Sequence, residues 1–563
     1  MHDTECRKVQ NQESRIQYHC LVLNFEIPIQ QIMSNRILKN LIDLVTGTFV
    51  SRILGFLREL VTAAFYGTTR AMDLFVIAFT IPTFFRHFLG EDVVERAFMP
   101  PFKRLVSQQK YSSAWRLLSS CFNIMTVILT ILMTILYFLA PLIVKIIAPG
   151  LEESLFPKAI TMTYWILPFM VIIGMAAFVG SVLNFFELNK IYSIAPAMLS
   201  VGVIIGIVCF KSSLETYALP LGFLIGGILQ LIVQLPFLLK EKIRKNAEAR
   251  YHLKIDLKEQ EFRTVGRESG FIFLKSILDQ SVEIVDRILA SFLLVGSIAS
   301  LWFAQRLIQL PVAIVGLAIS RSLIPYLTEK KALIQDDEFI AGIRLGIQLN
   351  FTMILPTIMI MVVMAKPIIS IVYQRGTFDG ESTRLTAIAF WCYSLGLLGI
   401  SLNAFFSRLF SIFQKNRIPF YVAIFYSLLN IGLKFVLVRT HLKHGGIALA
   451  SSIAFSASCV LLFYFLSKEI QHQIRLKAIL KDLATVGTIC IVIGALIFFI
   501  YHNVVGKFLD GYFHSLFLKN LVGLIIIGVI AGILYIGMIR LIGPKEIRER
   551  IKANGFFKVM TKN

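Results

Sequence analysis

Fourteen mostly apolar segments recur along this chain of 563 residues. Each is long enough to cross the roughly 30 Å hydrocarbon core of a membrane as a helix, which takes about 20 residues. Charged residues make up only 16% of the chain, whereas a soluble domain has roughly 25%. The sequence therefore predicts an all-α polytopic membrane protein with about 14 transmembrane helices. The predicted spans lie near residues 40–66, 72–98, 117–147, 158–186, 191–211, 216–239, 267–294, 297–324, 340–373, 384–410, 418–438, 446–467, 482–502 and 517–541.

The loops between these spans differ in charge. If successive loops lie on opposite sides of the membrane, the strongly basic ones, such as residues 240–266 and the C-terminal tail, fall on one side. Basic loops gather on the cytoplasmic side of a membrane. We therefore expect a multi-pass membrane protein with both termini in the cytoplasm. The net charge of +22 is explained by these loops, and no nucleic-acid partner is expected.

The two halves of the sequence resemble each other. Gly67 and Pro82 are separated by the same 15 positions as Gly296 and Pro311, and similar residues surround both pairs. Internal repeats on either side of a basic loop are typical of two-lobed transporters. The prolines recur at matching places, so we expect kinks with a mechanical role there.

This repeat predicts two pseudo-symmetric six-helix lobes followed by two C-terminal helices. Residues 1–32 are expected to be an N-terminal extension, either disordered or preceding a translation start at Met33. The remaining predicted units are an N-lobe over residues 33–239, a basic cytoplasmic loop over 240–266, a C-lobe over 267–470, and the last two helices with a basic tail over 471–563.

Charged side chains are concentrated in the first, second, seventh and eighth spans, which form the matching pairs. A charge at the centre of a bilayer costs roughly 2.5–3.5 kcal/mol on insertion scales, so such residues point to a polar interior. We favour a shared water-filled cavity over charges that only pair with their neighbours. Arg52, Arg58 and Arg86 stand out because well-placed acids near them are few. Arginine offers paired donors that fit phosphate or carboxylate, so the cavity is predicted to bind an anionic head group such as a diphosphate.

Metal and enzyme motifs are missing from the sequence. The seven cysteines are scattered and form no CxxC or Cys/His cluster, so no metal site and no cofactor are expected. A membrane enzyme acting on polyprenyl diphosphates remains an alternative, although no paired-aspartate motif or Ser/His nucleophile supports it.

Three segments carry a resemblance to a known family. "SRILGFLRE" at 51–59, "MDLFVIAFTIPTFFRHFLGEDVVERAFMPPF" at 72–102 and "SLWFAQRLIQLPVAIVGLAISRSLIPYL" at 300–327 resemble the MurJ (MviN) lipid II flippases of the multidrug/oligosaccharidyl-lipid/polysaccharide exporter superfamily. The resemblance implies a transporter rather than an enzyme. It would move undecaprenyl-diphosphate-linked disaccharide-pentapeptide from the inner to the outer leaflet of the bacterial inner membrane by alternating access, for peptidoglycan synthesis. A flippase for another undecaprenyl-linked glycan is the nearest alternative. We expect a monomer that contacts membrane lipids, with cell-wall synthesis or division proteins as possible partners.

The resemblance also assigns roles to individual residues. It implies that Arg52, Arg58, Arg86 and Arg306 bind the diphosphate or head group. The acids expected to pair with charges or to change conformation are Glu59, Asp73, Glu91 and Asp286. Asp92 stands where the family has glycine, so the local geometry beside Glu91 departs from the family pattern.

Some members of this family hold a sodium ion between the seventh and eleventh spans. Here Asp286 and Asn430 remain, but Lys434 occupies the position of the second carboxylate. An ammonium group there would oppose a bound cation, so we expect no metal and no sodium coupling. Lys434 is predicted either to pair with Asp286 or to extend to the membrane interface.

Overall fold

The computed structural model describes residues 43–44, 46–238, 251–253, 260–471, 473, 476–505, 508–509 and 515–554. The predicted extension over 1–32 and most of the basic loop over 240–266 lie outside the described residues. The described part is built from helices, beginning with a first helix over residues 46–66, and contains no strand.

The helices of the first half, including short 3₁₀ and π segments marked η, follow in chain order. They are α2 (Arg70–Phe85), η1 (Arg86–Phe98), α3 (Met99–Ser107), α4 (Tyr111–Ile147), η2 (Glu153–Leu155), α5 (Phe156–Ile166), α6 (Pro168–Phe185), α7 (Asn189–Leu214), η3 (Glu215–Tyr217) and α8 (Ala218–Leu238).

The second half begins with the long helix α9. Its elements are α9 (Gln260–Ser291), α10 (Ser297–Pro311), η4 (Val312–Gly316), α11 (Leu317–Ala332), α12 (Asp336–Val363), α13 (Ala365–Tyr373), α14 (Gly380–Ser394), α15 (Leu397–Ile412), α16 (Arg417–Leu437), α17 (His444–Glu469), α18 (Leu476–Ile500), η5 (Tyr501–Val505), α20 (Leu516–Ile542) and α21 (Lys545–Asn554).

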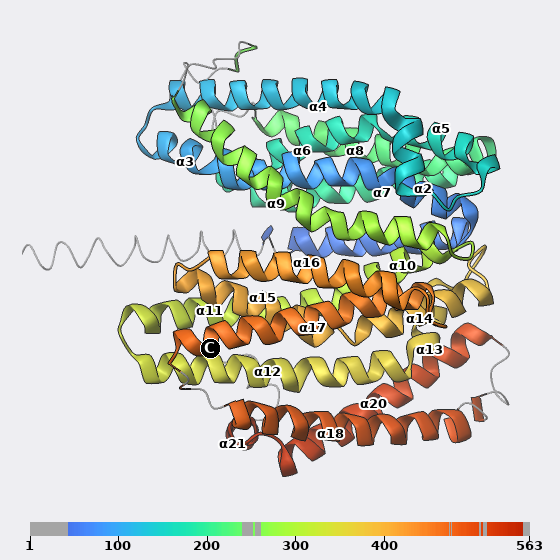
Figure 1. Ribbon diagram of the computed structural model, residues 1–563, viewed down its shortest axis with the longest axis vertical. Coiled ribbons are helices and arrows are strands. Elements are labelled where there is room, and N and C mark those ends of the chain that lie inside the picture. Colours follow the sequence, from blue (N-terminus) through green and yellow to red (C-terminus); the bar gives the residue numbers. More distant parts are fainter. Residues whose placement is uncertain are drawn as a thin grey trace, which may run out of the picture.

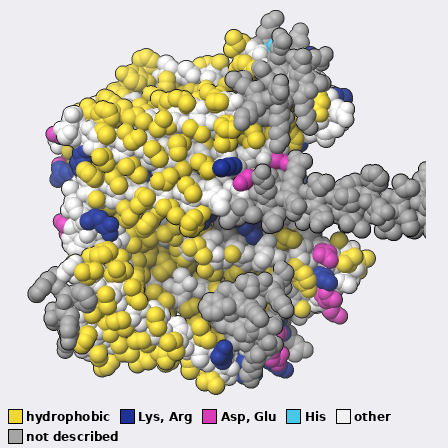
Figure 2. Space-filling model, turned by 180° about the vertical axis from the view of Figure 1, so that it is seen from behind, with side chains coloured by type: hydrophobic (Ala, Val, Ile, Leu, Met, Phe, Trp, Pro, Cys, Tyr) yellow, Lys and Arg dark blue, Asp and Glu magenta, His cyan; other side chains and the backbone are white. Residues whose placement is uncertain are grey.

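The long helices lie roughly side by side (Figure 1). Helices α4 to α8 occupy the upper half of that view, and α12, α18 and α20 occupy the lower half. Figure 2 shows a broad hydrophobic face on which most charged side chains lie toward the two edges. An apolar belt between polar edges is the surface expected of a protein surrounded by lipid.

Nine of the described helical segments are long and apolar enough to cross a membrane, or ten if the bent pair α14 and α15 forms one span. They cover eleven of the predicted spans, because residues 189–238 contain two helices, α7 and α8, that pack against each other. The three other predicted spans correspond to the first helix, to α2 with η1, and to α9. These contain most of the intramembrane charges, which lower their hydropathy. The count of fourteen therefore stays a prediction.

Glycine permits the close packing of α7 and α8. A Cβ added to Gly202 would collide with the backbone of Gly226, and one added to Gly206 would collide with Gly222. Small residues at such positions let the backbones of two membrane helices approach closely. This contact makes α7 and α8 one wall of the N-terminal half.

The matching prolines precede matching irregularities. Pro82 lies in the last turn of α2, which passes into the π-helix η1, and Pro311 ends α10, which passes into the π-helix η4. Proline removes a backbone donor and disfavours the α-helix before it, so a change of helical winding follows naturally. The predicted correspondence between the two halves is present in the backbone at these sites.

The last two long helices lie against the second half of the chain. The Tyr535 hydroxyl of α20 donates to the carbonyl of Thr352 in α12 at 2.6 Å, and Asn520 donates to Ser370 of α13 at 2.9 Å. These buried polar contacts hold α20 at the side of the C-terminal half.

Candidate functional site

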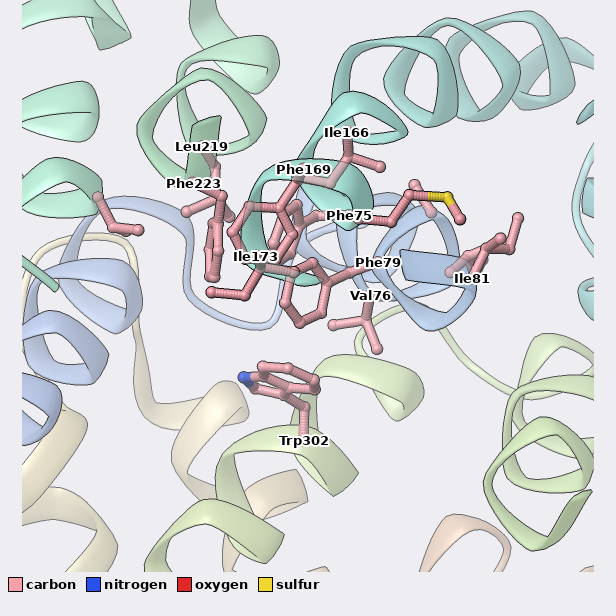
Figure 3. Close-up of a cluster of buried hydrophobic side chains, with 14 of the residues drawn as sticks. Phe75, Val76, Phe79, Ile81, Ile166, Phe169, Ile173, Leu219, Phe223 and Trp302 are labelled. Carbon is pink, nitrogen blue, oxygen red and sulfur yellow. The ribbon is translucent and has the colours of Figure 1, made fainter. Parts of the chain in front are cut away.

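An aromatic cluster fills the core between the two halves. Figure 3 shows Phe75 and Phe79 of α2 packed with Phe169 of α6 and Phe223 of α8, while Trp302 approaches from α10. The ring centres of Phe79 and Trp302 are 5.7 Å apart, in an edge-to-face arrangement. The cluster therefore connects helices from both halves of the chain.

Two of the predicted arginines lie on the rings of this cluster. The guanidinium of Arg306 is 4.1 Å from the ring centre of Trp302, and that of Arg58 is 5.7 Å from the ring centre of Phe223. An arginine over an aromatic face is held in place while its N–H groups remain available at the edge. The aromatic cluster thus positions cations contributed by both halves.

The predicted charged residues act on one another across the two halves. Arg58 donates to the carboxylate of Glu59 at 2.6 Å, and Glu59 is buried. The charges that act on Arg306 include those of Glu59, Arg58, Arg86 and Glu283. We refer to Arg58, Arg86 and Arg306 as the cationic cluster. Its three arginines outnumber the two acids of this group, so the site has an excess of positive charge.

Two hollows are lined by charged residues of the site. The first, of about 490 Å³, is lined by Arg86 and by side chains of η1, α6, α7 and α8; we call it the N-hollow. The second, of about 660 Å³, is lined by Glu283 and Asp286 of α9 and by residues of α10 and α14 to α17. Both volumes fall in the usual range of ligand sites, about 300–1,000 Å³.

The structure does not place Arg52 or Glu91 in the cationic cluster. Arg52 is on the first helix, and the six residues that separate it from Arg58 place it roughly 120° away around the helix axis. The side chain of Glu91 lies outside the described residues, although its backbone belongs to η1. Substrate binding by Arg52 and a role for Glu91 remain predictions.

Asp73 joins the two halves by capping a helix of the other half. Its buried carboxylate accepts the backbone N–H of Gly296 at 2.6 Å and that of Ala299 at 2.7 Å, at the start of α10. The first N–H groups of a helix have no partner within the helix and carry partial positive charge, so a carboxylate there is stabilising. Asp73 of the N-terminal half therefore caps a helix of the C-terminal half.

Further contacts close the same end of the molecule. The hydroxyl of Thr68 donates to that of Ser382 at 2.8 Å, and the N–H of Thr377 donates to the carbonyl of Ala64 at 2.8 Å. Gly67 has a φ of 55° and Gly296 a φ of 85°, and a side chain on either would collide with a backbone carbonyl of the opposite segment. We call this set of contacts the sealed end. The N–H of Ser382 also donates to Asp379, which holds the pKa of that exposed carboxyl below its usual value.

Asp286 forms the predicted pair with Lys434. The Nζ atom of Lys434 lies 2.6 Å from Oδ1 of Asp286 and also donates to the carbonyl of Val282 at 3.0 Å. Lys434 is fully buried in α16, so the alternative that it extends to the membrane interface is wrong. The pair joins α9 to α16.

Three charged residues in the site were missing from the predicted set. Glu283 acts on Arg306, and Arg287 is 3% exposed and acts on both Asp73 and Asp286. Asp92 contacts Arg96 at 3.1 Å and accepts a hydrogen bond from Ser276 of α9 at 3.0 Å. All three lie in charged spans already expected to face the interior. Their position in those spans would have been enough to add them to the predicted site residues.

Comparison with known proteins agrees with this architecture. The sequence model of the family described as lipid II flippase MurJ matches residues 62–521, which is most of the chain. The chain belongs to the MurJ family. Its relatives include the probable lipid II flippase MurJ of Buchnera aphidicola subsp. Acyrthosiphon pisum, 26% identical over 90% of this chain and 98% of that protein. The lipid II flippase MurJ of Burkholderia cenocepacia is 27% identical over 76% of this chain and 83% of its own length.

Solved structures show the same fold. A lipid II flippase MurJ in an inward closed conformation superposes with a TM-score of 0.72 at 23% identity, covering 88% of this chain and 98% of that one. A multidrug transporter of the MATE family, in an inward-facing conformation, superposes with a TM-score of 0.61 at 13% identity, covering 77% of this chain and 98% of its own. This chain therefore has the helical fold that these two transporters share.

Proposed function

We propose that this protein is a lipid II flippase of the bacterial inner membrane. It moves undecaprenyl-diphosphate-linked disaccharide-pentapeptide from the inner to the outer leaflet, where peptidoglycan is assembled. Transport needs no covalent chemistry, so the protein acts as a transporter and requires no cofactor.

The observation that carries this proposal is the cationic cluster at the junction of the two halves. The charges of Arg58 and Arg86 act on Arg306, and among the described residues two acids, Glu59 and Glu283, act on it with the opposite sign. Like charges held close together in a poorly hydrated site repel each other, and an anion between them relieves that repulsion. A diphosphate offers several oxygens to the forked N–H groups of arginine. The membership in the MurJ family supplies lipid II as the molecule that carries this diphosphate.

The sealed end supports transport by alternating access. We propose that it faces the periplasm, with both termini and the basic loop over 240–266 on the cytoplasmic side. Substrate then enters the cationic cluster from the cytoplasmic leaflet. Opening toward the periplasm requires the contacts of Asp73 with Gly296 and of Thr68 with Ser382 to break. These contacts are few, so the two halves are able to separate there while each keeps its own core.

The remaining residues have supporting roles in this proposal. Glu59 orients Arg58 through their ion pair, and Asp286 holds α9 against α16 through Lys434. Arg52 and Glu91 are proposed to contact the substrate or to assist the conformational change in another state of the transport cycle. We propose that the protein works as a monomer alongside cell-wall synthesis and division proteins, and that its last two long helices accommodate the lipid tail.

The test is a depletion experiment. A bacterial strain whose own flippase is under a repressible promoter receives this chain on a plasmid, and lipid II in each leaflet is measured by its accessibility to a periplasmic lipid II-cleaving colicin. We expect this chain to restore growth and periplasmic accessibility. Lipid II that remains confined to the cytoplasmic leaflet, despite normal membrane expression of the protein, would contradict the proposal.

A further inference from the structure

The N-hollow is lined by two glutamines whose side-chain carbonyl oxygens accept no hydrogen bond from the described residues. Gln230 and Gln234 of α8 line the hollow and are 6% and 1% exposed. Within the described part of the chain, the side-chain carbonyl oxygens of both residues accept no hydrogen bond. Buried amides are nearly always hydrogen-bonded in folded proteins, so two unpaired ones on the same wall call for an explanation.

Both glutamines line the hollow because of where they lie on α8. They are four residues apart, so they lie on the same face of α8, one turn above the other. The rest of α8 is almost entirely apolar. Amide side chains inside a membrane-spanning helix are expensive unless a partner or a polar cavity receives them. Here that cavity is the N-hollow.

The opposite wall leaves room for these amides. A Cβ added to Gly180 of α6 would lie 3.1 Å from Nε2 of Gln234 and 3.6 Å from the ring of Tyr192. Any residue larger than glycine at this position would crowd the Gln234 amide. The absence of a side chain at Gly180 therefore keeps the hollow open beside Gln234.

The charges of the N-hollow favour an uncharged ligand group. Its lining includes two arginines, Arg86 and Arg96, and two acids, Asp92 and Glu95, so the formal charges balance. Asp92 and Arg96 already neutralise each other at 3.1 Å. A second phosphate would gain little in such a site. A group with many hydroxyls suits it better, because each hydroxyl donates to an amide oxygen and accepts from an amide N–H.

We propose that Gln230 and Gln234 form a sugar subsite, which binds the carbohydrate directly attached to the diphosphate of the transported lipid. The subsite rests on the proposed function, because Arg86 belongs both to the cationic cluster and to the lining of the N-hollow. A diphosphate held at Arg86 places its attached sugar in or beside this hollow. The peptide is attached farther from the diphosphate than that sugar is. We therefore assign the sugar as the group that binds these amides.

The test compares two lipids that differ only in their head group. Binding of lipid II and of undecaprenyl diphosphate, which has no sugar, is measured with the full-length protein in nanodiscs. The variant Gln230→Leu/Gln234→Leu removes the amides and keeps similar volume. We expect its affinity for lipid II to fall roughly tenfold or more, as two or more neutral hydrogen bonds are lost, and its affinity for undecaprenyl diphosphate to stay the same.

Two further variants separate a sugar contact from a structural effect. Gln348→Leu removes a buried glutamine of α12, which donates to Asp482 at 2.8 Å and lies in the opposite half of the view in Figure 1 from α8, and it should change neither affinity. Gly180→Ala keeps both glutamines and crowds Gln234, so it should weaken lipid II binding severalfold and spare undecaprenyl diphosphate. This second route keeps the proposal testable if the double variant fails to fold.

The outcomes distinguish failure of the sugar subsite from failure of the proposed flippase function. Equal losses for both lipids, or no loss for lipid II in a folded double variant or in Gly180→Ala, would overturn the sugar subsite and leave the flippase proposal standing. Unchanged lipid II affinity in these variants would mean that the N-hollow holds only water. A wild-type protein that binds neither lipid would overturn the proposed function, and the subsite with it.

Discussion

The ammonium of Lys434 lies 2.6 Å from Oδ1 of Asp286, and both side chains are buried between α9 and α16. Removing one member of a buried ion pair leaves an uncompensated charge, which typically costs about 3–5 kcal/mol. We expect Lys434→Ala to lower the free energy of unfolding by about that amount. The measurement is thermal or denaturant unfolding of the purified protein in detergent.

The control for this prediction removes both charges. Lys434→Met combined with Asp286→Leu should recover most of the lost stability, because apolar residues of similar volume often replace a buried ion pair at little cost. Single variants that are as stable as the wild type would show that the pair contributes little to the fold.

The same pair predicts how transport is driven. A bound sodium ion would have to compete with an ammonium group that already occupies the carboxylate of Asp286. We expect transport in sealed vesicles to be unaffected when sodium is replaced by potassium. It should slow when the membrane potential is collapsed, because moving one charge across 100 mV is worth roughly 2.3 kcal/mol. A strict sodium requirement at constant potential would refute this prediction.

The cationic cluster predicts which arginines transport depends on. Arg58→Ala and Arg306→Ala should abolish complementation of a flippase-depleted strain while the proteins remain in the membrane. Arg306→Lys should rescue only in part, because lysine keeps the charge but lacks the planar fork and the stacking on Trp302. Arg321→Ala, at an exposed position of α11, is the matched control and should complement normally. Growth supported equally by Arg306→Ala would remove the cluster from the mechanism.

The sealed end predicts a reversible lock. Thr68 and Ser382 are in side-chain contact, with their hydroxyl oxygens 2.8 Å apart. The double variant Thr68→Cys/Ser382→Cys, in a background without the seven native cysteines, should form a disulfide under oxidation and stop transport. A reductant should restore transport, and each single cysteine variant should be insensitive to oxidation. Normal transport by the fully cross-linked protein would show that this end does not open.

The charge of the loops predicts the orientation in the membrane. Alkaline phosphatase, which is active only in the periplasm, should be inactive when fused after Lys562 and active when inserted after Glu153, in the turn between α4 and α5. The reverse pattern would invert the proposed orientation and place the sealed end in the cytoplasm.

Much of the architecture follows from local features of the sequence. Long apolar runs require helices in a membrane, because only helices and closed barrels satisfy their backbone groups there. The matching positions of Pro82 and Pro311 indicate where helical winding changes in both halves. Three of the four charged spans predicted to face the interior have too little apolar character to be recognised as membrane spans from hydropathy.

The particular partners of each charge were decided by the tertiary structure. Arg58 and Arg52 look equivalent in the sequence, yet only Arg58 is placed on Phe223 beside Glu59. The packing of the first helix determines which of its faces meets the rest of the protein. Asp73 caps a helix 223 residues away, and no local pattern encodes such a contact.

The amides of Gln230 and Gln234 illustrate the same division. Their spacing on α8 is a property of the sequence, and it determines that they share a face. Whether that face meets lipid, protein or a hollow depends on how α6, α7 and η1 pack around α8, which the local sequence of α8 does not contain. Sequence thus determined the helices, the membrane and the family, because these follow from local hydropathy and motif. Tertiary packing alone decided which buried groups are paired and which remain open to a ligand, because pairing depends on contacts between distant segments.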